Sequence, residues 1–160
     1  MYINSLELSH YRNYDALSIS FEPGITILYG DNAQGKTNIL EAIYMSGTTK
    51  SHRGTKDKDI IQFGEEESHI RLNLTKYDVM HRIDMHLKKN KTKGVAVDGQ
   101  SIRKSGELFG MIHIIFFSPE DLSIIKNGPS ERRRFMNLEL CQLNNCLLYT
   151  SPSPRDRTRS

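Results

Sequence analysis

The sequence predicts an α/β fold in which a mixed sheet with antiparallel hairpins is joined to a helix, and three observations support this prediction. An apolar run at 25–29 leads directly into a glycine-rich loop. Apolar residues then recur at helical spacing over 36–45. Apolar and polar residues alternate over about 69–104, which is typical of antiparallel hairpins.

Composition is that of a folded protein. The 160 residues are 37% apolar and 26% charged, which excludes the composition of a disordered chain. No apolar run approaches the roughly 20 residues that cross a bilayer, and the N-terminus lacks the pattern of a secretory signal, so we expect a cytoplasmic protein without membrane contact. Cys141 and Cys146 form neither a C-x-x-C metal motif nor a disulfide framework. The net charge of +3 does not by itself indicate a nucleic-acid binder.

The first half of the chain predicts strands, a loop and a helix. Residues 2–8 and 17–29 are expected to be strands, with a Pro23-Gly24 turn that divides the second range. The helix is expected over Lys36–Met45 with Glu41 facing outward, while its inward positions are Ile39, Leu40, Ile43 and Tyr44.

Farther along, Thr48–Gln62 is polar and basic and is expected to be an exposed loop. Asp98-Gly99 predicts a type I′ hairpin turn. Met111–Phe117 predicts a buried strand, and Ser118 or Pro119 could start a short helix that ends near Ile125. A last helix is expected over 130–143, with its apolar residues facing inward: Phe135, Met136, Leu138 and Leu140.

The glycine-rich loop fits the phosphate-binding pattern G-x-x-x-x-G-K-S/T and lies between an expected strand and a helix, as that motif requires. Its glycines allow backbone N–H groups to approach phosphates, and the helix N-terminus adds partial positive charge. The lysine would reach the β- and γ-phosphates, and the threonine hydroxyl would bind Mg²⁺. A loop that only turns a strand into a helix is the alternative, but the context favours nucleotide binding. The residues are Gly30, Asp31, Asn32, Ala33, Gln34, Gly35, Lys36 and Thr37.

Hydrolysis needs further groups. Glu120 and Asp121 follow the apolar strand expected at 112–117, as the acids of a Walker B motif do. Pro119 intervenes, however, and Glu120 is also suited to the start of the next helix. We therefore favour the capping interpretation and predict no catalytic residue.

A basic run, Arg132, Arg133 and Arg134, could contact DNA or a protein partner. Consecutive helical residues point about 100° apart, so the three cannot share one contact, and a solvated face is an equal alternative. From Cys146 to Ser160 the chain loses apolar periodicity and gains Pro, Ser and Arg. We interpret 146–160 as a non-native tail that resembles translated adapter sequence, although a basic arm or a frayed terminus would have a similar composition.

Several motifs together with the phosphate loop carry a family resemblance. They are Tyr11–Tyr14, Ser51–Arg53, Phe117–Leu122 and Gly128–Phe135. With these motifs, residues 1–145 resemble the N-terminal part of the RecF family of bacterial DNA replication and repair proteins. The resemblance implies a P-loop NTPase fold of the ABC/SMC-like ATPase-head type, here truncated.

The resemblance also implies a function: ATP-dependent DNA binding at single-strand gaps, in replication, recombinational repair, recombinase loading and the SOS response. ATP and Mg²⁺ would be the ligands, with Thr37 on the metal. Arg12 and Asn13 would lie where the first strand turns toward the nucleotide. The implied partners are double-stranded or gapped DNA, the recombination mediators RecO and RecR, and a second copy in an ATP-dependent homodimer.

The family's signature sequence, Walker B acid and D-loop lie downstream of residue 160. We therefore expect an N-terminal fragment that binds nucleotide without the weak ATPase activity of the intact family. One alternative is a self-contained P-loop kinase or small NTPase acting on a metabolite, with Glu120 or Asp121 as the metal acid. Another is a scaffold whose nucleotide only supports folding.

Overall fold

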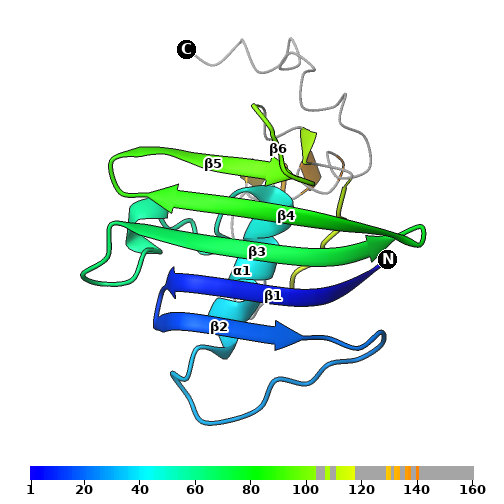
Figure 1. Ribbon diagram of the computed structural model, residues 1–160, viewed down its shortest axis with the longest axis horizontal. Helices are drawn as coiled ribbons and strands as arrows, with labels where there is room; N and C mark the ends of the chain where they lie inside the picture. The colour runs from blue at the N-terminus through cyan, green and yellow to red at the C-terminus, as the bar shows by residue number, and fades with distance from the viewer. Residues whose placement is uncertain are drawn as a thin grey trace. The chain divides into compact units, whose positions relative to one another are not determined.

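A computed structural model describes residues 1–103, 107–108, 111–117, 129–130, 132–133, 136–137 and 140. The chain forms two compact units, 1–105 and 106–160. In the first unit six strands form one antiparallel sheet in the order β2-β1-β3-β4-β5-β6, and α1 crosses one of its faces (Figure 1). The elements are β1 (Tyr2–Tyr11), β2 (Tyr14–Ser20), α1 (Lys36–Thr48), the 3₁₀ helix η1 (Asp57–Asp59), β3 (Glu67–Lys76), β4 (Val79–Lys88), β5 (Lys91–Val97) and β6 (Gln100–Ser101).

The core lies between the sheet and α1. Buried and accessible positions alternate along β3 and along most of β4, as expected for a sheet with one covered face. Across the strands Ile70 pairs with Met85 and Leu72 with Ile83, and all four side chains are buried. Burial of each such side chain contributes roughly 1.5–3 kcal/mol. From the helix, the buried apolar residues are Ile39, Ala42 and Met45.

The predicted antiparallel hairpins are confirmed. β3 pairs with β4, β4 with β5, and β5 with β6. At the last turn Asp98 and Gly99 have φ of 52° and 80°, the left-handed values that a type I′ turn requires at both central positions.

The expected strand at 25–29 does not form. Ile25, Ile27 and Tyr29 are 94%, 77% and 91% exposed. Their apolar pattern predicts a buried strand, but such a strand needs neighbours for its backbone and cover for its faces. The part of the first unit that the structure describes supplies no strand to pair with it.

The expected buried strand at 111–117 is also wrong over most of its length. Ile112 is buried, whereas Ile115 is 87% and Phe117 is 78% exposed. The physical reason is the same as for 25–29. An apolar run favours burial, but it forms a buried strand only where neighbouring strands pair with it and another layer covers it.

The segment 48–62 was expected to be an exposed loop, and this too is corrected. α1 extends to Thr48, and Ser51, Ile60 and Ile61 are buried. Tyr11 and Ile61 form an isolated antiparallel bridge, and the Arg12 N–H donates to the Ile60 carbonyl at 2.8 Å. The segment therefore packs along the end of β1 and contributes to the core.

In the second unit the described residues 129–130, 132–133, 136–137 and 140 are helical, in agreement with the helix expected over 130–143. Of the residues expected to face inward, Met136 and Leu140 are 58% and 44% exposed, and Phe135 and Leu138 lie outside the described residues. The short helix expected up to residue 125 and the tail 146–160 lie outside the described residues. No helix in the described ranges has the length and apolar character to span a membrane.

The prediction that Glu41 faces outward is wrong, since its side chain is fully buried, and Leu40 is instead 43% exposed. Arg12 forms a bidentate pair with this carboxylate: its Nε donates to Oε2 at 3.0 Å and its Nη2 to Oε1 at 2.8 Å. The Ser51 hydroxyl donates to Oε1 at 2.5 Å. A buried carboxylate is stable where such donors surround it, and this is why a charged residue lies on the inner side of α1.

The Arg12 guanidinium also fixes the segment after α1. Its Nη1 donates to the Asp59 carbonyl at 3.0 Å and its Nη2 to the Thr55 hydroxyl at 3.2 Å. Burial alone would raise the pKa of the Glu41 carboxyl, but the hydrogen bonds from Arg12 and Ser51 outweigh it and hold that pKa below the ordinary 4.5. Glu41 is therefore ionised at neutral pH.

Glu41→Gln is expected to lower the free energy of unfolding by about 3–5 kcal/mol, because it leaves the half-buried Arg12 without its counter-charge. Urea unfolding at pH 7 measures this. Glu7→Gln is the matched control: Glu7 pairs with Arg71 at 3.4 Å, but its side chain is 45% exposed, so the change should stay within about 0.5 kcal/mol.

The same comparison has a pH dependence. Because the pKa of Glu41 is lower in the folded state, its contribution is present above pH 4.5 and is lost as the pH falls below that value. The difference between wild type and Glu41→Gln should therefore shrink in acid. A difference that is constant from pH 7 to pH 3 would contradict this role of the pair.

Candidate nucleotide-binding site

The loop Gly30–Thr37 turns sharply into α1. Three of its residues have left-handed φ: Gly30 at 138°, Ala33 at 65° and Gly35 at 100°. Such values suit glycine and are unusual for alanine, so the loop is held in a defined, partly strained conformation. Successive turns of this kind direct backbone N–H groups toward a common point and form anion-binding concavities.

Lys36 folds back across this loop. Its Nζ donates to the Gly30 carbonyl at 2.7 Å and also to the Asp31 carbonyl. The ammonium group is therefore held by two carbonyls at the start of the loop. A single cation in this position supplies a point charge to any anion that the loop surrounds.

The N-terminus of α1 is open to an anion. Its cap residue is Gly35, no side chain caps it, and no acid lies in its first turn. Helix N-termini carry unsatisfied N–H groups and partial positive charge, which Ser, Thr, Asp or Asn caps usually neutralise. Here a ligand can take that place.

The β1–β2 turn holds the loop from outside. The Asn13 side-chain amide and the Tyr14 hydroxyl both donate to the Gln34 carbonyl, each at 3.3 Å. The Asn38 amide in turn donates to the Asn13 Oδ1 at 2.8 Å. Asn13 therefore bridges the loop and the helix that follows it.

Gly35 is required for two reasons. Its φ of 100° is unfavourable for any residue with a side chain, and an added Cβ would lie 2.5 Å from the Tyr14 hydroxyl and 2.8 Å from Asn13 Oδ1. The close approach of the turn to the loop depends on the missing side chain.

A hollow of about 300 Å³ adjoins the loop. It combines an apolar wall from the segment before the loop with polar groups of the loop and the β1–β2 turn. The lining residues are Tyr14, Ile27, Leu28, Tyr29, Gln34, Lys36 and Ile39. Its position beside Lys36 makes it the hollow that bears on the predicted chemistry.

The predicted site residues have different positions in the structure. Asn13 contacts the loop directly, whereas Arg12 turns away from it toward Glu41. Arg132 and Arg133 lie in the second unit and are exposed, and residue 134 and the two acids at 120–121 lie outside the described residues. The loop and the β1–β2 turn are thus the elements that the described structure brings together.

Two features were missed in the sequence. Tyr14 belongs to the Tyr11–Tyr14 motif, but the motif alone did not predict its contact with the loop. The partners of Glu41 were missed as well, although Ser51 and Arg53 both belong to the Ser51–Arg53 motif. The Arg53 guanidinium lies 3.9 Å from the Glu41 carboxylate. The signal that could have found them was the coincidence of an arginine turn, a helical acid and a Ser-His-Arg segment.

A family model described as an AAA domain matches residues 5–153. The DNA replication and repair protein RecF of Lachnoclostridium phytofermentans is 64% identical over 149 residues, which are 93% of this chain and 41% of that protein. The chain thus spans about two fifths of the length of the curated relatives that it matches.

Solved structures agree. A structure of the recombination mediator protein RecF with ATP, in the RecFOR pathway, superposes with a TM-score of 0.86 at 33% identity and covers 91% of this chain and 39% of its own. A structure from work on ATP-driven dimerization of SMC ATPases has a TM-score of 0.68 at 22% identity, over 86% of this chain and 99% of its own, which shows the fold alone. The predicted ATPase-head fold and the resemblance to RecF are confirmed, and the chain belongs to the AAA domain family.

Proposed function

We propose that this chain binds ATP through Gly30–Thr37. The observation that carries the proposal is the uncapped N-terminus of α1, preceded by a loop that is left-handed at three positions and whose first carbonyls hold the Lys36 ammonium. The similarity to a RecF protein solved with ATP supports the same ligand. Backbone N–H groups, one lysine and one threonine hydroxyl form the donor set that a triphosphate with Mg²⁺ requires.

Each residue has a task in this proposal. The loop backbone and Lys36 would neutralise the phosphates, and the Thr37 hydroxyl would bind Mg²⁺ held by the same oxygens. Asn13 would position the loop through its bond to Gln34, and Arg12 would act indirectly by fixing the β1–β2 turn on Glu41.

For the whole protein we propose a cytoplasmic function in DNA replication and recombinational repair, since the curated relatives that it matches bear the name DNA replication and repair protein RecF. ATP-dependent binding of gapped DNA, dimerisation, an SOS role and cooperation with RecO and RecR belong to this proposal. Repair relatives at 64% identity do not favour the alternative of a metabolite kinase. Arg132, Arg133 and Arg134 stay candidates for DNA or partner contact.

Lys36→Ala is expected to abolish the thermal stabilisation by Mg-ATP. Ligand at 100 times Kd stabilises the folded state by about 2.7 kcal/mol, and the variant loses the cation that faces the phosphates. Differential scanning fluorimetry with and without Mg-ATP measures this. Lys91→Ala, an exposed lysine on β5, should shift as wild type does. Equal shifts for Lys36→Ala and wild type would contradict the assignment of the loop.

Gly35→Ala is expected to weaken ATP binding about tenfold or more, which corresponds to about 1.4 kcal/mol. The new methyl group would push the loop away from Tyr14 and Asn13. Gly24→Ala is the matched control, because Gly24 also has a left-handed φ, of 121°, but has no atom within 4 Å of an added Cβ. Titration with a fluorescent ATP analogue measures both. If the two variants lose affinity equally, backbone strain alone explains the loss and the contact with Tyr14 is irrelevant.

In the full-length protein, ATP is expected to increase the retention of gapped duplex DNA in a filter-binding assay. Lys36→Ala should lower retention with ATP to the level without ATP, since a nucleotide that is not bound cannot shift the protein toward a DNA-binding state. Retention that is independent of ATP in wild type would sink the proposal of ATP-gated DNA binding while leaving ATP binding itself intact.

A further inference from the structure

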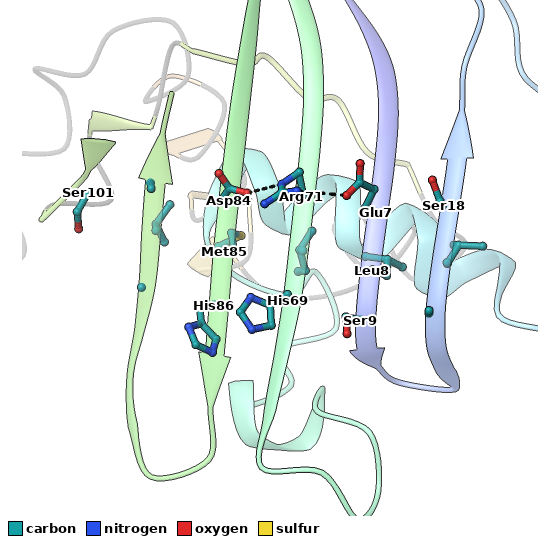
Figure 2. Close-up of a pocket in the computed structure, with 16 residues that line it drawn as sticks. Glu7, Leu8, Ser9, Ser18, His69, Arg71, Asp84, Met85, His86 and Ser101 are labelled. Atoms are coloured by element: carbon teal, nitrogen blue, oxygen red, sulfur yellow. Dashed lines mark hydrogen bonds and ion pairs between the residues drawn. The ribbon is translucent and has the colours of Figure 1, made fainter. Parts of the chain in front are cut away.

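The outer face of the sheet, opposite α1, carries a second group of polar side chains. In β3 the residues Ser68, Ile70 and Leu72 are buried, so Glu67, His69 and Arg71 point to the other face. In Figure 2 the labelled side chains of His69 and His86 lie next to each other on the adjacent strands β3 and β4. Neither histidine has a task in the proposed nucleotide site.

Strand register brings three ligating side chains together. His69 is directly opposite His86 in the β3–β4 pair. Glu67 precedes His69 by two residues and therefore lies on the same face, one step along the strand. Three residues of one hairpin thus share one patch of surface.

Distances within this group are short. The Glu67 Oε2 lies 3.0 Å from His86 Nε2, and its Oε1 lies 4.0 Å from His69 Nε2. The two imidazole rings are stacked, with centroids 3.9 Å apart. One ligand atom from each of the three residues falls within 4.8 Å of the other two, and among the described residues this is the group of three that could hold a metal ion.

We propose that Glu67, His69 and His86 form a zinc site on the outer face of the sheet. Two imidazole nitrogens and one carboxylate oxygen are a donor set that Zn²⁺ takes, with a water molecule as fourth ligand. Mg²⁺ and Ca²⁺ prefer oxygen donors and are disfavoured by the two histidines.

The ligand atoms are close to the separations of a zinc site. Zinc–ligand bonds of about 2.0–2.1 Å at tetrahedral angles place donor atoms about 3.4 Å apart. The ligand atoms of the three residues lie within 4.8 Å of one another, and zinc binding would require the two stacked rings to rotate so that one nitrogen of each points at the ion.

Small neighbours leave room for the ion and its water. Gly94 on β5 is opposite His86, and Ser9 on β1 is opposite His69. Both line a hollow of about 770 Å³ together with the two histidines (Figure 2). The site is open to solvent on this side, as a site with a bound water requires.

Nearby cations are already engaged. Arg71 forms ion pairs with Asp84 at 2.7 Å and Glu7 at 3.4 Å, so its charge is compensated. Lys88 lies 3.4 Å from Glu67, but its side chain is 38% exposed and that of Glu67 is 48% exposed. An exposed pair of this kind is worth little, and Zn²⁺ can displace the lysine from the carboxylate.

The test is a zinc titration of the 160-residue chain at pH 7.5 in a Cys141→Ser/Cys146→Ser background, which removes the two thiols as competing ligands. Competition with a chromogenic chelator measures stoichiometry and affinity, and Co²⁺ substitution reports tetrahedral coordination in the visible spectrum. His69→Gln, His86→Gln and Glu67→Gln are the test variants. His81→Asn is the matched control, since His81 lies on the same strand and pairs with one acid, Asp98, at 2.9 Å.

We expect one equivalent of Zn²⁺ to bind. Each test variant should lower the zinc affinity on the order of tenfold or more, and His81→Asn should leave it unchanged. Zinc should also raise the Tm of the parent chain and not that of His86→Gln, and circular dichroism verifies that each variant is folded. No zinc binding, or binding that survives both His69→Gln and His86→Gln, would overturn the proposal. Binding of Mg-ATP should be unaffected by any of these variants.

Discussion

A carboxylate without solvent exposure is stable only where cations and hydrogen-bond donors surround it, and Glu41 obtains these from two other segments of the chain. Arg12 comes from the β1–β2 turn, while Ser51 and Arg53 come from the segment after α1. The Arg12–Glu41 ion pair thus connects the sheet, the helix and the segment that follows the helix. If either partner were removed, the other would be left as an uncompensated charge, mostly out of reach of water.

The Arg12–Glu41 ion pair also determines the shape of the candidate nucleotide site. Asn13 and Tyr14 follow Arg12 directly in the chain, so fixing Arg12 on the helix places them against the loop. Both donate to the same carbonyl of Gln34, and the absence of a side chain at Gly35 lets them approach. The loop is therefore held in place from outside by the turn, before any ligand binds.

Much of this arrangement was predictable from local patterns. The alternation in β3 and β4 indicated their pairing, and Asp98-Gly99 indicated its turn type, because both depend on neighbouring residues alone. The phosphate-loop motif likewise located the candidate site. Glu41 was assigned to the wrong face because helical periodicity counts a charge as polar, and it cannot detect a partner 29 residues earlier in the chain.

The zinc ligands were missed for a related reason: Glu67 and His69 are two residues apart, but His86 joins them only through the register of the hairpin. The two expected strands that do not form, at 25–29 and 111–117, show a second limit of prediction from local patterns. Their apolar residues indicate that the segment would be stabilised by burial, but the run itself does not show which element would cover it.

The exposed apolar segment 25–29 affects the nucleotide site. Ile27 and Tyr29, which are 77% and 91% exposed, precede the loop and line the hollow beside Lys36. Covering such side chains contributes roughly 1.5–3 kcal/mol each, so whatever packs on 25–29 also stabilises the loop that follows it. The curated relatives are more than twice as long as the matched region, and we expect their additional residues to supply this cover. ATP affinity would then increase with the length of the chain even though every phosphate-binding residue is already present, because the energetic cost of ordering the loop would no longer fall on the ligand alone.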